Sequence, residues 1–148
     1  MTVTQATIDM QSVETVLNKK IKSELAGAFP NLTIFQENQH ADTPPIDKTG
    51  DNSEFVTITV NYGSTVQDSK STAKRPGIAT VQIFTPLGTG TGRAIEIAEV
   101  IIKKCSFVTW VDQVLVTQES TFFKVGKQGS HYQSNVDITF EYAKNTKN

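Results

Sequence analysis

A group of three glycines is the first feature of the chain that could carry chemistry. Gly88, Gly90 and Gly92 lie between a strand-like and a helix-like segment, where nucleotide-binding folds place a phosphate-binding loop. The spacing does not fit G-x-G-x-x-G, because the third glycine comes too early, and no lysine followed by Ser or Thr completes a P-loop. Asp112 stands near the position of a ribose-binding acid, but the chain offers at most one strand–helix–strand unit. The glycines therefore predict a tight structural turn, with nucleotide binding as a distant alternative.

The chain has two histidines, His40 and His131, and nothing in the sequence pairs them. A Ser-His-Asp site can be assembled from distant residues, but the G-x-S-x-G motif that presents a nucleophilic serine is absent. We expect both histidines at the surface or at a strand edge. We expect no catalytic residue, and the sequence predicts a protein that is not an enzyme.

Metal and cofactor sites are not indicated either. The spacing of Asp42, Asp47 and Asp51 does not match the D-x-D-x-D-G loop that surrounds calcium, so these carboxylates are expected to be solvated. Cys105 is the single cysteine, which excludes an internal disulfide and a cysteine-based zinc site. It ends an apolar helical stripe, where cysteine usually packs as a small buried hydrophobe. We therefore expect neither a metal nor a cofactor.

The composition is that of an ordinary globular domain. The chain has 148 residues, 37% hydrophobic and 20% charged, which is enough for one core of its own. A net charge of −1 and a pI of about 6.1 do not favour bulk electrostatic binding to nucleic acid or to an anionic membrane. No secretory signal is visible, and no run approaches the roughly 20 apolar residues of a membrane span. We expect a single soluble domain over residues 1–148, made inside the cell.

Helical periodicity predicts two helices. The first covers residues 8–28, where an apolar side chain recurs at every fourth position and so stays on one face. These apolar residues are Val13, Leu17, Ile21 and Leu25. The second covers Gly92–Cys105, with Ile and Ala on one face, and Thr89 or Thr91 is expected to cap its start.

Alternation of apolar and polar residues, together with short apolar runs, predicts the strands. They cover residues 32–35, 54–62, 77–85, 111–117, 121–126 and 131–142. Trp110, just before the fourth, is expected to pack in the core or in an interface. Residues 36–53 hold almost no apolar side chain and are predicted as a long loop or mobile arm. Residues 63–74 form a second polar link, and residues 144–148 are expected to fray.

This order of elements predicts an α+β fold. A mostly antiparallel sheet of about five or six strands would carry two helices packed on one face, with long polar loops. The opposite face of the sheet would be uncharged and rich in Thr, Gln and Asn. A small sheet with long polar links suits a subunit that neighbouring subunits complete.

The stretch from Arg75 to Ala94, with the sequence RPGIATVQIFTPLGTGTGRA, resembles the central motif of phage tail-terminator-like proteins. In that family an R-x-G-like entry leads into a V-x-V strand, a P-x-G-x-G turn and a helix rich in Ala and Ile. Residues 129–140, GSHYQSNVDITF, are similar to the family's closing strand. The resemblance covers most of residues 13–142, but only the Arg75–Ala94 block is specific to the family. Residues 36–53 match no part of the family pattern.

The resemblance implies a structural virion protein of a long-tailed bacteriophage. In this family the subunits assemble in the host cytoplasm into a ring, usually of six, on the head-proximal end of the tail tube. The ring stops polymerisation of the major tail tube protein and offers a surface to the head-completion protein, while DNA passes through the lumen as cargo. A ring requires a heterologous contact, in which one patch of a subunit meets a different patch of the next.

We expect the contacts with neighbouring subunits or with the tube in the two polar segments. The candidates are Asp42, Asp47, Asp51, Gln67, Lys70, Lys74 and Arg75. Three alternatives stay open. A head–tail connector or other tail-completion subunit, and an accessory subunit of a contractile or tail-derived particle, would share size and ring assembly. A small-molecule or nucleotide binder is the distant alternative, and a specific nucleotide would then raise the melting temperature.

Deleting residues 40–50 should leave the fold intact and abolish the capping of tails, because this segment has too few apolar residues to contribute to a core. Circular dichroism checks the fold, and electron microscopy of phage tails checks the capping. Normal capping by the deletion variant would show that residues 40–50 are not needed for the capping of tails.

Overall fold

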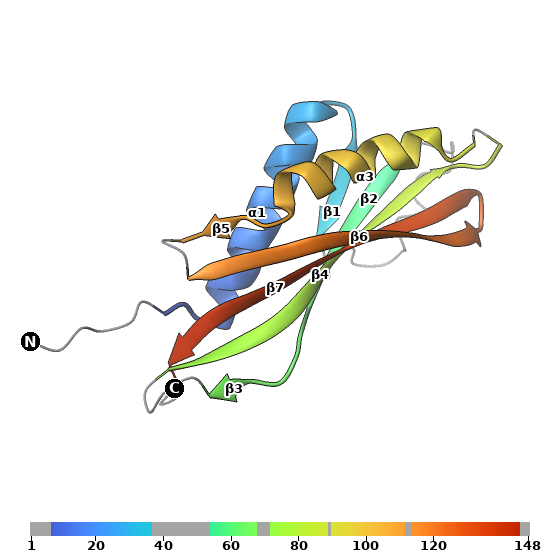
Figure 1. The fold of residues 1–148 in the computed structure, drawn as a ribbon. Coiled ribbons are helices and arrows are strands. Elements are labelled where there is room, and N and C mark those ends of the chain that lie inside the picture. Colours follow the sequence, from blue (N-terminus) through green and yellow to red (C-terminus); the bar gives the residue numbers. More distant parts are fainter. Residues whose placement is uncertain (1–6, 37–53, 68–71, 89, 112–113, 146–148) are drawn as a thin grey trace, which may run out of the picture.

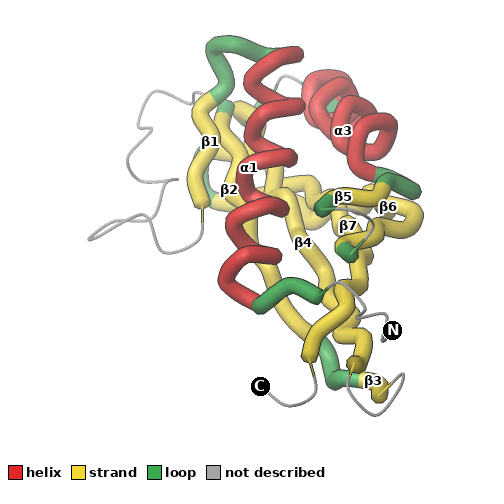
Figure 2. Tube along the Cα trace, turned by 90° about the vertical axis from the view of Figure 1, so that its left-hand side faces the viewer, coloured by secondary structure: helices red, strands yellow, loops and turns green. Residues whose placement is uncertain are grey.

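The chain forms an α+β fold, as the sequence predicts. The computed structural model describes residues 7–36, 54–67, 72–88, 90–111 and 114–145. Two helices, α1 (Met10–Ala28) and α3 (Gly92–Cys105), accompany a curled and mostly antiparallel sheet (Figure 1). Figure 2 shows both helices on the same side of that sheet. Neither helix in the described ranges is long and apolar enough to cross a membrane.

Six strands follow one another across the sheet in the order β1-β2-β4-β7-β6-β5, and β3 pairs with β4 outside this path. The strands are β1 (Thr33–Gln36), β2 (Phe55–Tyr62), β3 (Val66–Gln67), β4 (Thr72–Pro86), β5 (Thr109–Trp110), β6 (Leu115–Gln128) and β7 (His131–Asn145). β1 runs parallel to β2, and every other pairing is antiparallel. β4 and β7 are each 15 residues long and pair along their whole length, so they form the central ladder of the sheet.

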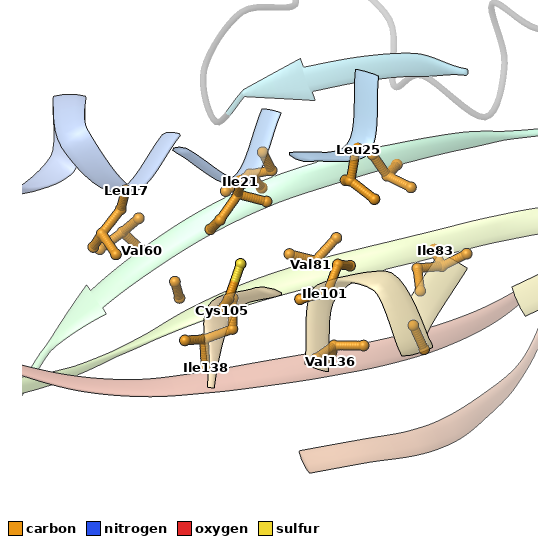
Figure 3. Close-up of a cluster of buried hydrophobic side chains, with 14 of the residues drawn as sticks. Leu17, Ile21, Leu25, Val60, Val81, Ile83, Ile101, Cys105, Val136 and Ile138 are labelled. Carbon is orange, nitrogen blue, oxygen red and sulfur yellow. The ribbon is translucent and has the colours of Figure 1, made fainter. Parts of the chain in front are cut away.

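The core lies between the helices and one face of the sheet. The four apolar residues predicted for the first helix are all fully buried, which confirms its predicted face. In Figure 3, Leu17 and Ile21 of α1 lie beside Val60 of β2, and Cys105 of α3 lies beside Ile138 of β7. Each fully buried aliphatic side chain of this kind stabilises the fold by about 1.5–3 kcal/mol. Asp9 caps α1, because its carboxylate accepts a 2.8 Å hydrogen bond from the Ser12 backbone N–H.

Three predictions about the strands were wrong, each because a paired strand does not need an apolar sequence. The polar link 63–74 contains β3 and the first residues of β4, which pair with β3 and with the end of β7. The two strands predicted at 111–117 and 121–126 are one strand, β6, with register shifts at Thr117/Ser120 and Lys124/Gly126. Lys144 and Asn145, predicted to fray, pair with β4, and residues 146–148 lie outside the described residues.

The sheet face opposite the helices carries a hydrogen-bonded set of polar side chains. Thr57 Oγ1 donates to Gln82 Oε1 at 2.6 Å, from β2 to β4. Thr80 Oγ1 of β4 donates to Asp137 Oδ1 of β7 at 2.8 Å. The predicted Thr and Gln content is therefore present, but the prediction of an uncharged face was wrong, because Asp137 lies on it.

One end of this face holds a cluster of aromatic rings. Phe55 of β2 stacks on Phe84 of β4 with 4.6 Å between ring centroids, and Phe35 of β1 meets Phe55 edge-on at 5.9 Å. The imidazole of His131 also meets Phe55 edge-on at 5.2 Å, and His131 has no exposed surface. The prediction of a surface or strand-edge position for His131 was wrong, because β7 lies between β4 and β6. His40 lies outside the described residues.

The glycine of the Arg-Pro-Gly entry has a packing role. A Cβ at Gly77 would collide with the Phe140 ring and lie 2.6 Å from the backbone carbonyl oxygen of Asn61. Both neighbours belong to paired strands, so neither can move away freely. Only glycine therefore lets β2, β4 and the Phe140 ring approach this closely.

Gly77→Ala should destabilise the fold by about 1–3 kcal/mol, because the added methyl group overpacks a fixed site. Gly27→Ala is the matched control, since nothing lies within 4 Å of a Cβ placed there on α1. The control should stabilise the fold by about 0.5–1 kcal/mol through helix propensity. Urea unfolding measures both, and a neutral Gly77→Ala variant would contradict the packing role.

Candidate assembly surface

The Arg75–Ala94 block forms one continuous unit from β4 through a turn into α3. Gly88 and Gly90 have φ angles of +85° and +78°, a conformation that favours glycine, which confirms the predicted structural turn. Gly92 begins α3 and has no positive φ. Thr91 stands at the N-cap position without a side-chain capping hydrogen bond, and Thr89 lies outside the described residues.

Arg93, within this block, joins three elements, and sequence reasoning gave it no role. Its Nη2 and Nε donate to the two carboxylate oxygens of Glu54, before β2, at 2.6 and 2.8 Å. Its Nη1 donates to Glu96 of α3 at 3.2 Å, and its guanidinium lies 4.5 Å from the centroid of Phe29 at the end of α1. The hydrogen bond with Glu54 is the main reason that the pKa of Arg93 is raised. An arginine just inside a helix start is the only sequence signal for this contact.

Three of the predicted contact residues lie together at one end of the sheet. Gln67 of β3 is exposed and sits opposite Ala73 of β4, next to Lys74 and Arg75. Lys74 Nζ lies 3.9 Å from the Glu141 carboxylate, and Arg75 Nε donates to Thr65 Oγ1 at 3.0 Å. The other candidates, Asp42, Asp47, Asp51 and Lys70, lie outside the described residues.

A hollow of about 500 Å³ lies beside Arg75, and we call it the Arg75 hollow. It is lined by Thr7, Ile8, Asp9, Met10, Ser12, Arg75, Tyr142 and Lys144. Met10 is 40% exposed and gives the hollow an apolar wall. Two cations, Arg75 and Lys144, outnumber the one anion, Asp9, whose pKa is lowered by the Ser12 backbone N–H. The Arg75 hollow is thus partly apolar with a positive rim.

A second exposed feature lies at the connection from α3 to β5 and β6, residues 106–111, which we call the Phe107 turn (Figure 1). Phe107 is 74% exposed and Val111 is 41% exposed. Their φ angles are +53° and +55°. This left-handed conformation costs about 1–2 kcal/mol for a non-glycine residue, and it is an outlier for a bulky or β-branched one. Sequence reasoning missed this turn, because neither residue belongs to a turn motif.

Hydrogen bonds to β6 hold the Phe107 turn in place. The Thr117 N–H donates to the carbonyl oxygen of Val108 at 2.8 Å, and Thr117 Oγ1 accepts from the Val108 N–H at 3.0 Å. Ser106 Oγ donates to Ser120 Oγ at 2.9 Å and accepts from the Ser120 N–H at 3.1 Å. The Phe107 N–H donates to Gln118 at 3.3 Å. These bonds compensate the strained backbone, so Phe107 is displayed by a fixed scaffold.

The free edge of β6 beyond β5 is the third exposed feature. Phe123 and Val125 are both exposed there. The register shift at Lys124/Gly126 interrupts the ladder, and Lys124 and Lys127 add positive charge. Bulges and lysines are devices that prevent the pairing of edge strands. These features disfavour pairing of the β6 edge with a strand of another molecule.

No reactive cluster was found in the ranges that the structure describes. No three His, Cys, Asp or Glu side chains gather there to hold a metal ion. Cys105 is fully buried, as predicted. Trp110 is partly buried and packs against the core, in agreement with its predicted role.

Comparisons with known proteins identify the fold and no more. No family model matches the sequence, and no curated protein matches it. The structure does match 22 solved chains. One of them, known by a sequence identifier alone, superposes with a TM-score of 0.67 at 12% identity, over 91% of this chain and 96% of its own. The fold is a known one. At this identity the likeness extends to the fold alone.

The buried thiol predicts a pH-dependent loss of stability. Burial, and secondarily the Glu24 carboxylate, raise the pKa of Cys105 from 9.0 to about 12. Between pH 9 and 12 the unfolded thiol ionises while the folded thiol stays protonated, so rising pH favours the unfolded state. From pH 8 to 10 the wild-type chain should therefore lose about 1 kcal/mol more stability than Cys105→Ala in urea unfolding. Equal losses would mean that the folded thiol ionises normally.

Proposed function

We propose that this protein is a non-enzymatic structural subunit of a long-tailed phage virion, the tail terminator. In this proposal the subunits form a ring, with six copies, on the head-proximal end of the tail tube. The ring stops polymerisation of the major tail tube protein and then receives the head-completion protein. DNA passes through its lumen as cargo, and assembly takes place in the host cytoplasm.

The observation that carries the proposal is the Arg75–Ala94 block. The motif glycines, and Arg93 beside them, have separate structural tasks in this fold. Gly77 admits the close approach of β4, Gly88 and Gly90 make the turn into α3, and Arg93 joins α3 to β2 and α1. The motif glycines therefore lie where the fold requires a close strand approach and a positive φ, as the resemblance implies. This supports kinship with the tail-terminator-like family.

The distribution of exposed surface supports assembly into a ring. A heterologous contact joins two different patches. The chain offers two patches of different chemistry, namely the Arg75 hollow with its positive rim and the Phe107 turn with its exposed aromatic ring. The end of the sheet where Gln67 of β3 lies next to Lys74 and Arg75 of β4 is the proposed contact with a neighbour or with the tube.

The first experiment is electron microscopy of particles from a phage that lacks this gene. Overlong headless tails are expected, because nothing then stops growth of the tube. A plasmid copy of the wild-type gene should restore tails of normal length, which controls for effects on neighbouring genes. Tails of normal length beside filled, unjoined heads would instead make the protein a head–tail connector or completion subunit.

A further inference from the structure

We propose that the Arg75 hollow is a binding site for a carboxylate group, which an acidic side chain of a partner protein supplies. The hollow gathers three kinds of hydrogen-bond donor that no described residue satisfies. They are the terminal guanidinium nitrogens of Arg75, the ammonium group of Lys144 and the hydroxyl of Tyr142. This inference goes beyond the proposed function, because it assigns a ligand class to these side chains whatever particle the subunit belongs to.

The register of the central ladder puts the two cations next to each other. Arg75 lies opposite Tyr142 and Ala73 lies opposite Lys144, so Arg75 and Lys144 are diagonal neighbours on one face of β4 and β7. Tyr142, on that same face, belongs to the core, so the face is the one toward the helices. Long side chains at diagonal positions reach each other, and two like charges there repel. An anion bound between them removes this repulsion.

The guanidinium of Arg75 is already oriented for such an anion. The side chain is half-buried, and its Nε donates to Thr65 Oγ1 at 3.0 Å. Its two Nη atoms make no hydrogen bond to a described residue, so they are available for a two-point pair with a carboxylate. Because the planar group is held through Nε, little further conformational entropy is lost when a ligand binds.

Tyr142 adds a neutral donor to the lining of the hollow. Its side chain is only 1% exposed, with its ring beside those of Phe140 and Tyr62. The hydroxyl of a buried tyrosine normally has a hydrogen-bond partner, but no described residue provides one here. A ligand oxygen in the hollow gives this hydroxyl its acceptor.

The charge and the wall of the hollow favour a carboxylate. Among the lining residues Arg75 and Lys144 are positive and Asp9 is negative, which leaves a net charge of two minus one, or +1. Asp9 caps the start of α1 and does not sit between the two cations as their counter-ion. A carboxylate balances this charge, whereas a phosphate dianion exceeds it. Ile8 and Met10 offer apolar contact to the methylene groups of an acidic side chain.

A recessed site favours a protein side chain over DNA. Duplex DNA presents its phosphates on a stiff convex surface, and proteins that bind it neutralise many phosphates at once. The hollow has two cations within about 500 Å³, and the whole chain has a net charge of −1. A single acidic side chain can enter such a recess, and the partner is therefore a protein with an exposed glutamate or aspartate.

Two short peptides test the site. Acetyl-Leu-Glu-Leu-amide carries one carboxylate between aliphatic side chains, and acetyl-Leu-Gln-Leu-amide is its neutral isostere. The glutamate peptide should bind the full-length chain with a Kd of about 1 mM, and the glutamine peptide at least about tenfold more weakly, because it loses the charge-assisted hydrogen bonds. Amide shifts in the NMR spectrum of the isotope-labelled chain measure both, and they should cluster at Thr7, Ile8 and Lys144. Equal binding of the two peptides, or shifts elsewhere alone, would overturn the site.

Substitutions identify the donors. Arg75→Gln and Lys144→Gln should each weaken binding of the glutamate peptide by about five- to tenfold, and Tyr142→Phe by about threefold. Tyr142→Phe should melt at the wild-type temperature or higher, because it removes a hydroxyl that lacks a described partner. Lys20→Gln is the matched control, since it removes an exposed positive charge of α1 outside the hollow and should leave the Kd unchanged. Wild-type binding by the Arg75 and Tyr142 variants would contradict the assignment.

Two further probes identify the source of the anion. Inorganic phosphate, and a DNA duplex of about 20 base pairs, should both bind at the hollow more weakly than the glutamate peptide at equal ionic strength. Tighter binding of inorganic phosphate at the same residues would overturn the carboxylate. Tighter binding of the duplex there would overturn the protein partner.

The peptide experiment and the phage experiment fail separately. Overlong tails in the gene-deleted phage support the terminator without reference to the hollow, so they would stand even if the glutamate peptide did not bind. Tails of normal length together with selective binding of the glutamate peptide would overturn the terminator and support the carboxylate site.

Discussion

The antiparallel ladder between β4 and β7 is the constraint on which the other features depend. Its register runs from Thr72 opposite Asn145 to Pro86 opposite His131, so it determines which side chains of both strands face the helices. If β7 slipped by one residue against β4, Val136 would turn away from the core and Asp137 would enter it. The helices can cover the sheet only because this register puts every second side chain of both strands on their side.

The same ladder explains the places where close approach or burial is unusual. Gly77 lies opposite Phe140, so the ring of Phe140 covers the glycine and leaves no room for a Cβ. At the other end His131 closes the ladder between two neighbouring strands and is buried against Phe55. Arg93 then fixes α3 to the start of β2 through Glu54. These contacts hold the sheet and helices together without any disulfide.

The contacts that stabilise the fold and the surfaces proposed for assembly are separate. The core residues of α1 and α3 are buried within one subunit, whereas Phe107 is exposed on a strained turn that hydrogen bonds to β6 support. A subunit built in this way stays folded before it meets a neighbour, because none of its core contacts depends on Phe107. The β6 edge, by contrast, is interrupted by a register shift and flanked by lysines, which disfavours uncontrolled pairing.

The sequence by itself determined the elements whose pattern repeats. The period of Val13, Leu17, Ile21 and Leu25 predicted α1 and its buried face, and alternation predicted β2 and β7, because local geometry alone sets these periods. The glycine turn before α3 was also predictable, since positive φ favours glycine. Only the tertiary structure decided that residues 72–76 belong to a strand, that His131 is buried and that Phe107 is exposed. Each of these depends on a partner in another element, such as β7 for the first and β6 for the last, and no local pattern encodes such a partner.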